Sequence, residues 1–213
     1  MNRTFPSHAS FWKRILTLAG GLVLATAPLL AQANGNGNGN GTGGGAGQGP
    51  GNGTGLCPGT CVTAPQPLSE AEAASLAFMR EEEKLARDLY RRLHAKWNVR
   101  AFDRIAESEQ RHFDAIGRLL ERHQQADPAA GNAEGVFKNQ ALQNLFNELL
   151  AKGGQSVKDA LEVGVLVEKT DIADLEKALP TLTNTEVKRV YTSLLSGSMS
   201  HLDSFESLLE VVN

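Results

Sequence analysis

Glu109 and His112 stand three residues apart, a spacing that places both side chains on one face of an α-helix. On a helical wheel of about 100° per residue they share a stripe with Ile105 and Ile116, the side that an amphipathic helix buries. A buried carboxylate is costly unless it is paired or binds a metal ion. We therefore interpret this pair as a candidate metal-binding motif.

The same conflict between polar residue type and apolar helix face recurs in three other segments. Each conflict falls close to the midpoint of a predicted helix, so helices of similar length that pack side by side would bring these groups to one level. Several carboxylates at one level repel one another, and a pair of metal ions would remove that repulsion. The residues concerned are Glu83 in the first helix, Glu168 and Asp171 in the third, and Ser198 and His201 in the fourth.

Helical periodicity runs through the chain from Ser69 onward, and we find no convincing strand pattern there. Capping-box pairs predict two helix starts, one at Ser69 with Glu72 and one at Thr183 with Glu186. Four long helices are expected, and the connection over 125–155 should carry a short helix of its own. The long helices are predicted over 69–97, 101–124 and 156–179, and from 183 nearly to the C-terminus.

The first part of the sequence has a different character. Residues 1–33 combine a basic start, an apolar run and a small-x-small site, which predicts a cleaved secretory signal peptide. We therefore expect an exported protein, periplasmic or secreted, with no membrane span after cleavage. The predicted removal takes three basic and no acidic residues from a chain of net charge −3, and this acidic balance argues against a nucleic-acid partner.

Residues 34–67 are rich in Gly and Asn and predict a disordered linker. This segment includes CPGTC, whose Cys57 and Cys61 we expect to form a small disulfide loop in an exported protein, with a free or metal-binding pair as the alternative. The remaining residues, 68–213, are predicted to form one all-α domain. We expect a four-helix bundle whose long crossover carries a short extra helix.

The chain from about residue 68 to residue 212 resembles the ferritin-like superfamily and, more closely, a family of uncharacterised prokaryotic proteins within it, domain of unknown function 2202. The spacing Glu83-x-x-Ala86-x-x-x-Tyr90 is similar to that around the first metal-ligating glutamate of ferritins, bacterioferritins and rubrerythrins. Glu109-x-x-His112 resembles the motif of their second helix. The resemblance implies a ferritin-like bundle with a di-iron site, in which Tyr90 orients a ligating carboxylate.

The resemblance also assigns roles in the third and fourth helices. It implies that Glu168 is a bridging or terminal carboxylate, with Asp171 as a second acid, and that His201 is an imidazole ligand. The fourth helix departs from the family's Glu-x-x-His, because Ser198 stands where glutamate is expected. Asp171 or Glu82 could supply the missing oxygen, Ser198 could leave a position open for water, peroxide or oxygen, or the site could hold a single ion.

The first helix leaves a choice between two neighbouring glutamates. The apolar stripe centres nearer Glu82, whereas the spacing to Ala86 and Tyr90 favours Glu83. We select Glu83 as the ligand and keep Glu82 as its substitute.

Carboxylates combined with imidazoles suit iron or manganese, with zinc as an alternative, and disfavour calcium. We expect a non-haem di-iron oxidoreductase that reacts with oxygen or peroxide, has no catalytic residue apart from the metal ligands and needs an external electron donor. The alternatives are a non-catalytic protein that binds or sequesters metal, and a metal-free helical interaction module. The oligomeric state is not predicted. The predicted ligands are Glu83, Glu109, His112, Glu168, Asp171 and His201.

Four further residues receive structural roles. Glu81 lies in the charged run REEEK and is expected to be solvated. His123 lies near the end of the second helix, where it would cap the helix or interact with its dipole. Tyr191 and Met199 are expected in the core.

Overall fold

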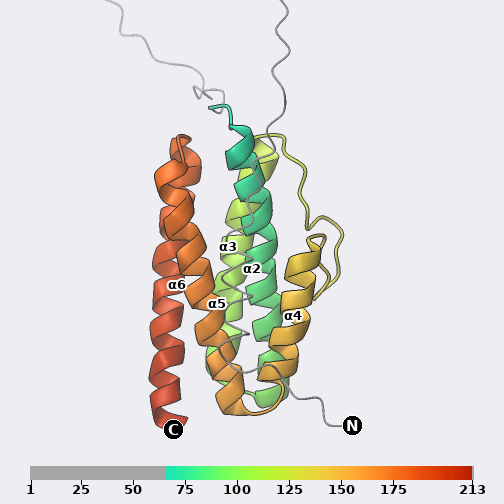
Figure 1. Ribbon diagram of the computed structural model, residues 1–213, viewed down its shortest axis with the longest axis vertical. Coiled ribbons are helices and arrows are strands. Elements are labelled where there is room, and N and C mark those ends of the chain that lie inside the picture. Colours follow the sequence, from blue (N-terminus) through green and yellow to red (C-terminus); the bar gives the residue numbers. More distant parts are fainter. Residues whose placement is uncertain (1–65, 213) are drawn as a thin grey trace, which may run out of the picture. The chain divides into compact units, whose positions relative to one another are not determined.

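The computed structural model describes residues 66–212, and all regular structure in that range is helical (Figure 1). The all-α fold class predicted from the sequence is therefore confirmed for the described part. The predicted signal peptide, most of the linker and the Cys57–Cys61 loop lie outside the described residues. The helices are α2 (Glu70–Trp97), α3 (Arg100–Arg122), α4 (Gln140–Gly153), α5 (Val157–Ala178), the 3₁₀ helix η1 (Leu179–Thr181) and α6 (Thr185–Val212).

Four long helices, α2, α3, α5 and α6, lie side by side (Figure 1). The most extensive packing joins α2 to α3 and α5 to α6, and the two pairs meet where α3 contacts α6 and α2 contacts α5. The shorter α4 lies in the connection between α3 and α5 and packs against α2 and α5. Among the helices within residues 66–212, none combines the length and the apolar character that a membrane span needs.

Local side-chain hydrogen bonds explain where the helices begin. Ser69 and Glu72 form the predicted capping box at the start of α2. Ser156 caps α5, as predicted, by accepting the Asp159 N–H. The prediction that Thr183 caps α6 is wrong, because the Asn184 side chain accepts the N–H groups of Glu186 and Val187 instead. Thr183 bonds with Glu72, so the carboxylate at the start of α2 also holds the turn before α6.

Two apolar clusters make up the core, and a polar layer separates them along all four long helices. On α2, for example, Met79 belongs to one cluster and Leu85 to the other, with Glu83 between them. On α6, Leu194 and Phe205 likewise lie on either side of the polar stretch. The predicted polar layer is therefore present between the two apolar clusters, although it is not the only buried polar group among the described residues.

The middle of α2 is buried on its outer side as well, because the connection before α4 packs over it. Lys84 is 1% exposed, and its Nζ donates to Asp88 Oδ2 at 2.6 Å and to the Ala133 carbonyl at 2.8 Å. Asp88 in turn accepts the Gly135 N–H at 2.8 Å. The buried ion pair therefore ties the connection to α2.

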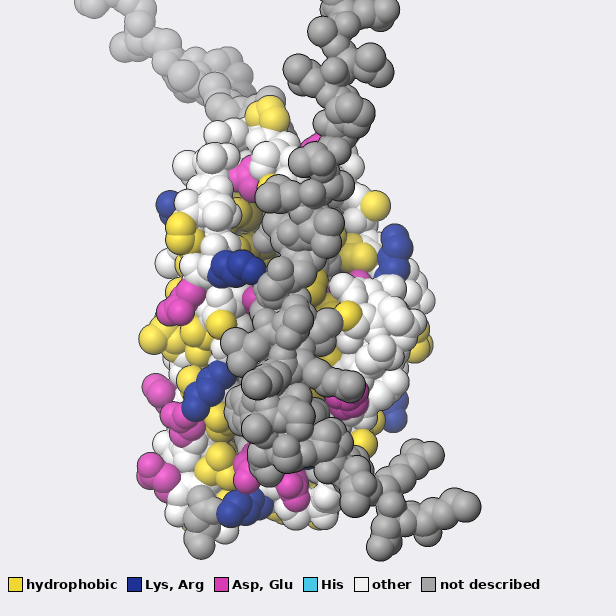
Figure 2. Space-filling model, in the orientation of Figure 1, with side chains coloured by type: hydrophobic (Ala, Val, Ile, Leu, Met, Phe, Trp, Pro, Cys, Tyr) yellow, Lys and Arg dark blue, Asp and Glu magenta, His cyan; other side chains and the backbone are white. Residues whose placement is uncertain are grey.

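Two sequence predictions about exposure are wrong. Glu81 is buried, because its carboxylate accepts the N–H groups of Lys138 and Asn139 just before α4. Met199 is 53% exposed, because it lies on the outer face of α6, whereas Tyr191 is buried as predicted. On the face visible in Figure 2, acidic and basic side chains of the described residues are interspersed, without a large patch of one sign.

The Lys84–Asp88 pair yields a stability prediction. Replacement Asp88→Ala leaves Lys84 buried without its counter-ion and should lower the free energy of unfolding by about 3 kcal/mol or more. Urea denaturation followed by circular dichroism measures the loss, with Glu107→Ala on an exposed helix face as the control. The double replacement Lys84→Met, Asp88→Leu should recover part of the stability, and equal losses in Asp88→Ala and the control would contradict the assignment.

Candidate metal centre

The polar layer brings together the predicted site residues from all four long helices. α2 contributes Glu83, and α3 contributes Glu109 and His112, one turn apart. Apart from His112, whose side chain is 12% exposed, the members of this layer are buried. The other members are Glu168 and Asp171 on α5, and Ser198 and His201 on α6.

Glu109 is the shared member of two clusters that could each hold a metal ion. Glu83, Glu109 and His112 form the first cluster, and Glu109, Glu168 and His201 form the second. The Nδ1 of His112 lies 2.8 Å from Glu109 Oε2, and the Nδ1 of His201 lies 2.7 Å from Glu109 Oε1. The two oxygens of one carboxylate thus face two different imidazoles, whose ring centres are 5.6 Å apart.

Four buried atoms of these clusters lack hydrogen-bond partners. Nδ1 of His112 and of His201 lie close to carboxylate oxygens, but their geometry is not that of a hydrogen bond. Glu83 Oε1 and Glu109 Oε1 are likewise without a partner. Buried polar atoms are normally satisfied, and carboxylate oxygens and imidazole nitrogens are the atoms that bind divalent transition metals. The donor set therefore fits a metal ion in each cluster.

A second set of contacts fixes the orientation of the carboxylates. The Tyr90 hydroxyl donates to Glu168 Oε1 at 2.6 Å, which is the orienting contact expected for this tyrosine. The Ser198 hydroxyl donates to Asp171 Oδ2 at 2.5 Å. Ser198, at the position where the sequence resemblance led us to expect glutamate, is thus in contact with an acid from α5, and Asp171 Oδ1 has no partner.

Gly197 allows α6 to approach the site closely. A Cβ atom at this position would lie 2.6 Å from His112 Nε2, well inside van der Waals contact. Because His112 is held between this backbone and the carboxylates of Glu83 and Glu109, its Nδ1 faces the centre of the layer.

Burial and mutual charge shift the pKa values of the acids in different directions. Burial, together with the charge of Glu109, raises the pKa of Glu168 to about 8. Burial likewise raises the pKa of Asp171 to about 7, and that of Glu83 well above its ordinary range. Burial also opposes ionisation of Glu109, but its contacts with His112 and the second histidine outweigh burial and lower its pKa to about 2.

The two histidines hold protons when no metal is bound. Burial lowers their pKa values, but close contacts with Glu109 and a second carboxylate outweigh this effect. The pKa of His112 rises to about 11 and that of His201 to about 9. Metal binding must therefore displace protons from both imidazoles and from the acids of the layer.

The geometry also separates Glu82 from Glu83. Glu83 is a member of a donor cluster, whereas Glu82 is not and instead interacts with the carboxyl group of Asp174 on α5. Asp174 was not among the residues predicted from the sequence. Its position three residues after Asp171, on the same helix face, was the signal that could have found it.

His123 lies away from the centre. It is the residue at which α3 ends, and its Nε2 lies 3.7 Å from Glu186 Oε2 of α6. This position agrees with the predicted role at a helix end.

Comparison with known proteins places the chain in a family. Residues 72–212 match the family model described as uncharacterized protein domain (DUF2202), and the chain belongs to this family. It is 46% identical over 144 residues to the uncharacterized protein MJ0754 of Methanocaldococcus jannaschii, a match covering 68% of this chain and 78% of that protein. A crystal structure of the hypothetical protein MJ0754 from Methanococcus jannaschii DSM 2661 superposes with a TM-score of 0.68 and covers 69% of this chain and 84% of that one.

The raised pKa values predict that the metal-free protein is more stable near pH 5 than near pH 8. Glu168 and Asp171 ionise at about 8 and 7 in the folded protein, against ordinary values of 4.5 and 3.8, so stability falls as the pH rises through this window. His112 and His201 change the stability in the same direction. Their protonated forms stabilise the fold fully below pH 6.5, and this stabilisation is lost as the pH rises toward their folded pKa values.

Differential scanning calorimetry in the presence of a chelator measures this dependence. We expect Tm to fall from pH 5 to pH 8 in the wild type, and to fall less in the double variant Glu168→Gln, Asp171→Asn, which cannot release these protons. A Tm that rises over the same interval in the wild type would show that the carboxylates are ionised in the metal-free protein.

Proposed function

We propose that this protein is a ferritin-like four-helix bundle that holds a non-haem dinuclear metal centre and uses it to react with oxygen or peroxide. The observation that carries the proposal is the position of Glu109, whose two carboxylate oxygens face two imidazoles from different helices at 2.7 and 2.8 Å. A carboxylate shared between two donor clusters is the arrangement that bridges two ions. Iron is the favoured metal, with manganese or zinc as alternatives.

The ligands divide between two positions. One ion would be bound by Glu83, Glu109 and His112, and the other by Glu109, Glu168 and His201. Asp171 lies beside Ser198, where the Glu-x-x-His pattern has its glutamate, and would complete the set from α5. The four carboxylates then carry four negative charges, which balance two divalent ions in a buried layer.

The negative charge of the buried acids also favours two bound metal ions over protons alone. Without metal, the layer has to retain protons on both imidazoles and on several acids, as the raised pKa values of Glu168 and His112 show. Two divalent ions would take the place of those protons, and the oxygens and nitrogens that lack hydrogen-bond partners would be available to hold them. Binding should therefore strengthen as the pH rises.

The protein's own residues position the centre and limit access of water. Tyr90 fixes one oxygen of Glu168, and Gly197 allows α6 to pack against His112. The apolar clusters on both sides of the layer exclude solvent.

When bound, a ferrous pair would supply two electrons, enough to reduce peroxide to water with two protons, and an external donor would have to restore the ferrous state. Export to the periplasm or outside the cell remains part of the proposal.

Metal analysis tests this function. After anaerobic loading with ferrous iron and desalting, the wild type should retain about two irons per chain, as a two-metal site requires. Glu109→Gln should lose both ions, because both positions share this carboxylate, whereas His112→Ala and His201→Ala should each lose about one. His94→Ala is the matched control, since the His94 side chain contacts the Val99 carbonyl away from the polar layer.

Circular dichroism of each variant separates loss of metal from loss of fold. If the folded wild type retains no more iron than Glu109→Gln, the chain is a metal-free helical protein. If it retains two ions that neither oxygen nor peroxide oxidises, a non-catalytic role in metal binding replaces the oxidoreductase.

A further inference from the structure

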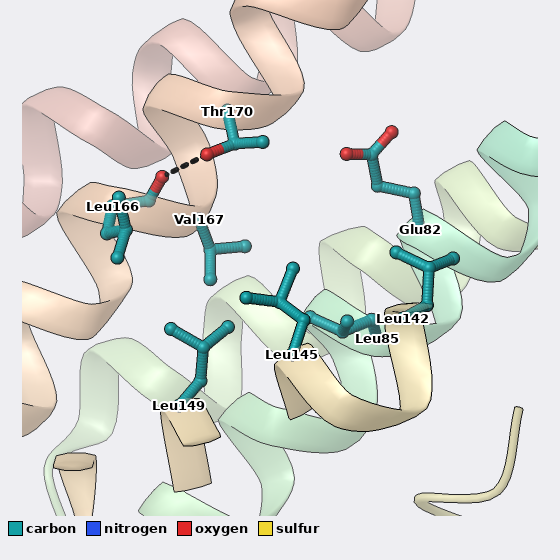
Figure 3. A pocket seen from close by; sticks show the side chains of 8 residues that line it. All are labelled: Glu82, Leu85, Leu142, Leu145, Leu149, Leu166, Val167 and Thr170. Atoms are coloured by element: carbon teal, nitrogen blue, oxygen red, sulfur yellow. Dashed lines mark hydrogen bonds between the residues drawn. The ribbon is translucent and has the colours of Figure 1, made fainter. Parts of the chain in front are cut away.

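Glu82 is a buried acid that the two donor clusters leave unused. Glu82 is 8% exposed and carries an oxygen without a hydrogen-bond partner, and its carboxyl group interacts with that of Asp174. Figure 3 shows its carboxyl group pointing into a pocket between α2, α4 and α5. Of the described residues that line this pocket, Glu82 is the one with an ionisable side chain, and Leu142 and Leu145 are typical of the others.

The pocket adjoins the candidate metal centre. A second, smaller cavity is lined by acids of the polar layer, including Glu83, Glu109 and Asp171, and Glu82 lines both cavities. Val167 is the other residue that the two cavities share. Glu82 therefore lies in the wall between the pocket and the metal centre.

A series of carboxylates leads from the surface to the candidate metal centre, and their exposed fractions decrease along the series. Asp174 is partly exposed, Glu82 and Asp171 are 8% and 6% exposed, and Glu83 is 2% exposed. Each of the three buried acids has one oxygen without a hydrogen-bond partner. Neighbouring members are close enough that the charges of Asp171, Asp174 and Glu83 all act on Glu82.

We propose that Asp174 and Glu82 form the access path by which a divalent cation reaches the dinuclear centre. The inference rests on the proposed function, because it assumes that Glu83 and Asp171 bind metal. A cation that leaves water needs oxygen atoms at successive positions, since crossing the leucine-lined wall without them would cost too much desolvation free energy. An acidic opening in an apolar wall also concentrates cations and speeds their association.

The access path predicts that variants of its residues take up metal more slowly but bind the same number of ions. Co²⁺ is mixed anaerobically with the metal-free full chain in a stopped-flow instrument, and free Co²⁺ is followed with a weaker chromogenic chelator. Asp174→Asn and Glu82→Gln should each slow metal uptake at least about fivefold, within the range that electrostatic steering supplies. The number of Co²⁺ ions bound at equilibrium should stay that of the wild type. Glu176→Gln, an exposed acid on the same helix, is the matched control.

Each outcome separates this inference from the proposed function. Slower uptake in both path variants, with unchanged stoichiometry and a normal control, supports the access path. Unchanged uptake rates overturn it while leaving the dinuclear centre intact. A loss of bound Co²⁺ in Glu82→Gln overturns it by making Glu82 a ligand, and a wild type that binds no Co²⁺ overturns the proposed function together with the path.

Discussion

The burial of several carboxylates between two apolar clusters is the constraint on which the rest of the structure depends. Glu83, Glu109, Glu168 and Asp171 lie in a layer that solvent barely reaches, and burial together with mutual repulsion raises the pKa values of all but Glu109. Protons on the acids and on the two histidines can relieve that repulsion, but they leave donor atoms without partners. Two divalent ions would relieve it and satisfy the same atoms, which is why we propose a dinuclear centre.

The surrounding elements keep this layer in place. Tyr90 and Ser198 hold individual carboxylates, and Gly197 lets α6 pack closely against His112. Outside the layer, the Lys84–Asp88 pair fastens the connection before α4 to the outer face of α2. The helix α4 contributes no member of the donor clusters, but its leucines line the pocket into which Glu82 points (Figure 3). Contacts within the polar layer and contacts on the outer face of α2 thus both stabilise an arrangement whose burial costs free energy.

The sequence predicted the helices and the inward face of each well, because apolar periodicity and capping residues are local signals. Their positions near the midpoints of the predicted helices also predicted that Glu83, His112, Glu168 and Ser198 lie at one level. The sequence misplaced Glu81, since the backbone that this carboxylate caps lies more than fifty residues further along the chain. Asp174 was missed for a similar reason, because its partner Glu82 belongs to another helix. The match to the family model confirms the membership in domain of unknown function 2202 that the sequence predicted.

The central claim is that Glu109 bridges two metal ions, and anomalous diffraction from crystals grown anaerobically with ferrous iron tests it most directly. The account predicts two iron peaks, one on each side of the Glu109 carboxylate, about 3.5 to 4 Å apart. One peak should lie beside His112 and the other beside His201. A single peak, or iron bound only at surface carboxylates while the polar layer stays free of metal, would contradict the claim.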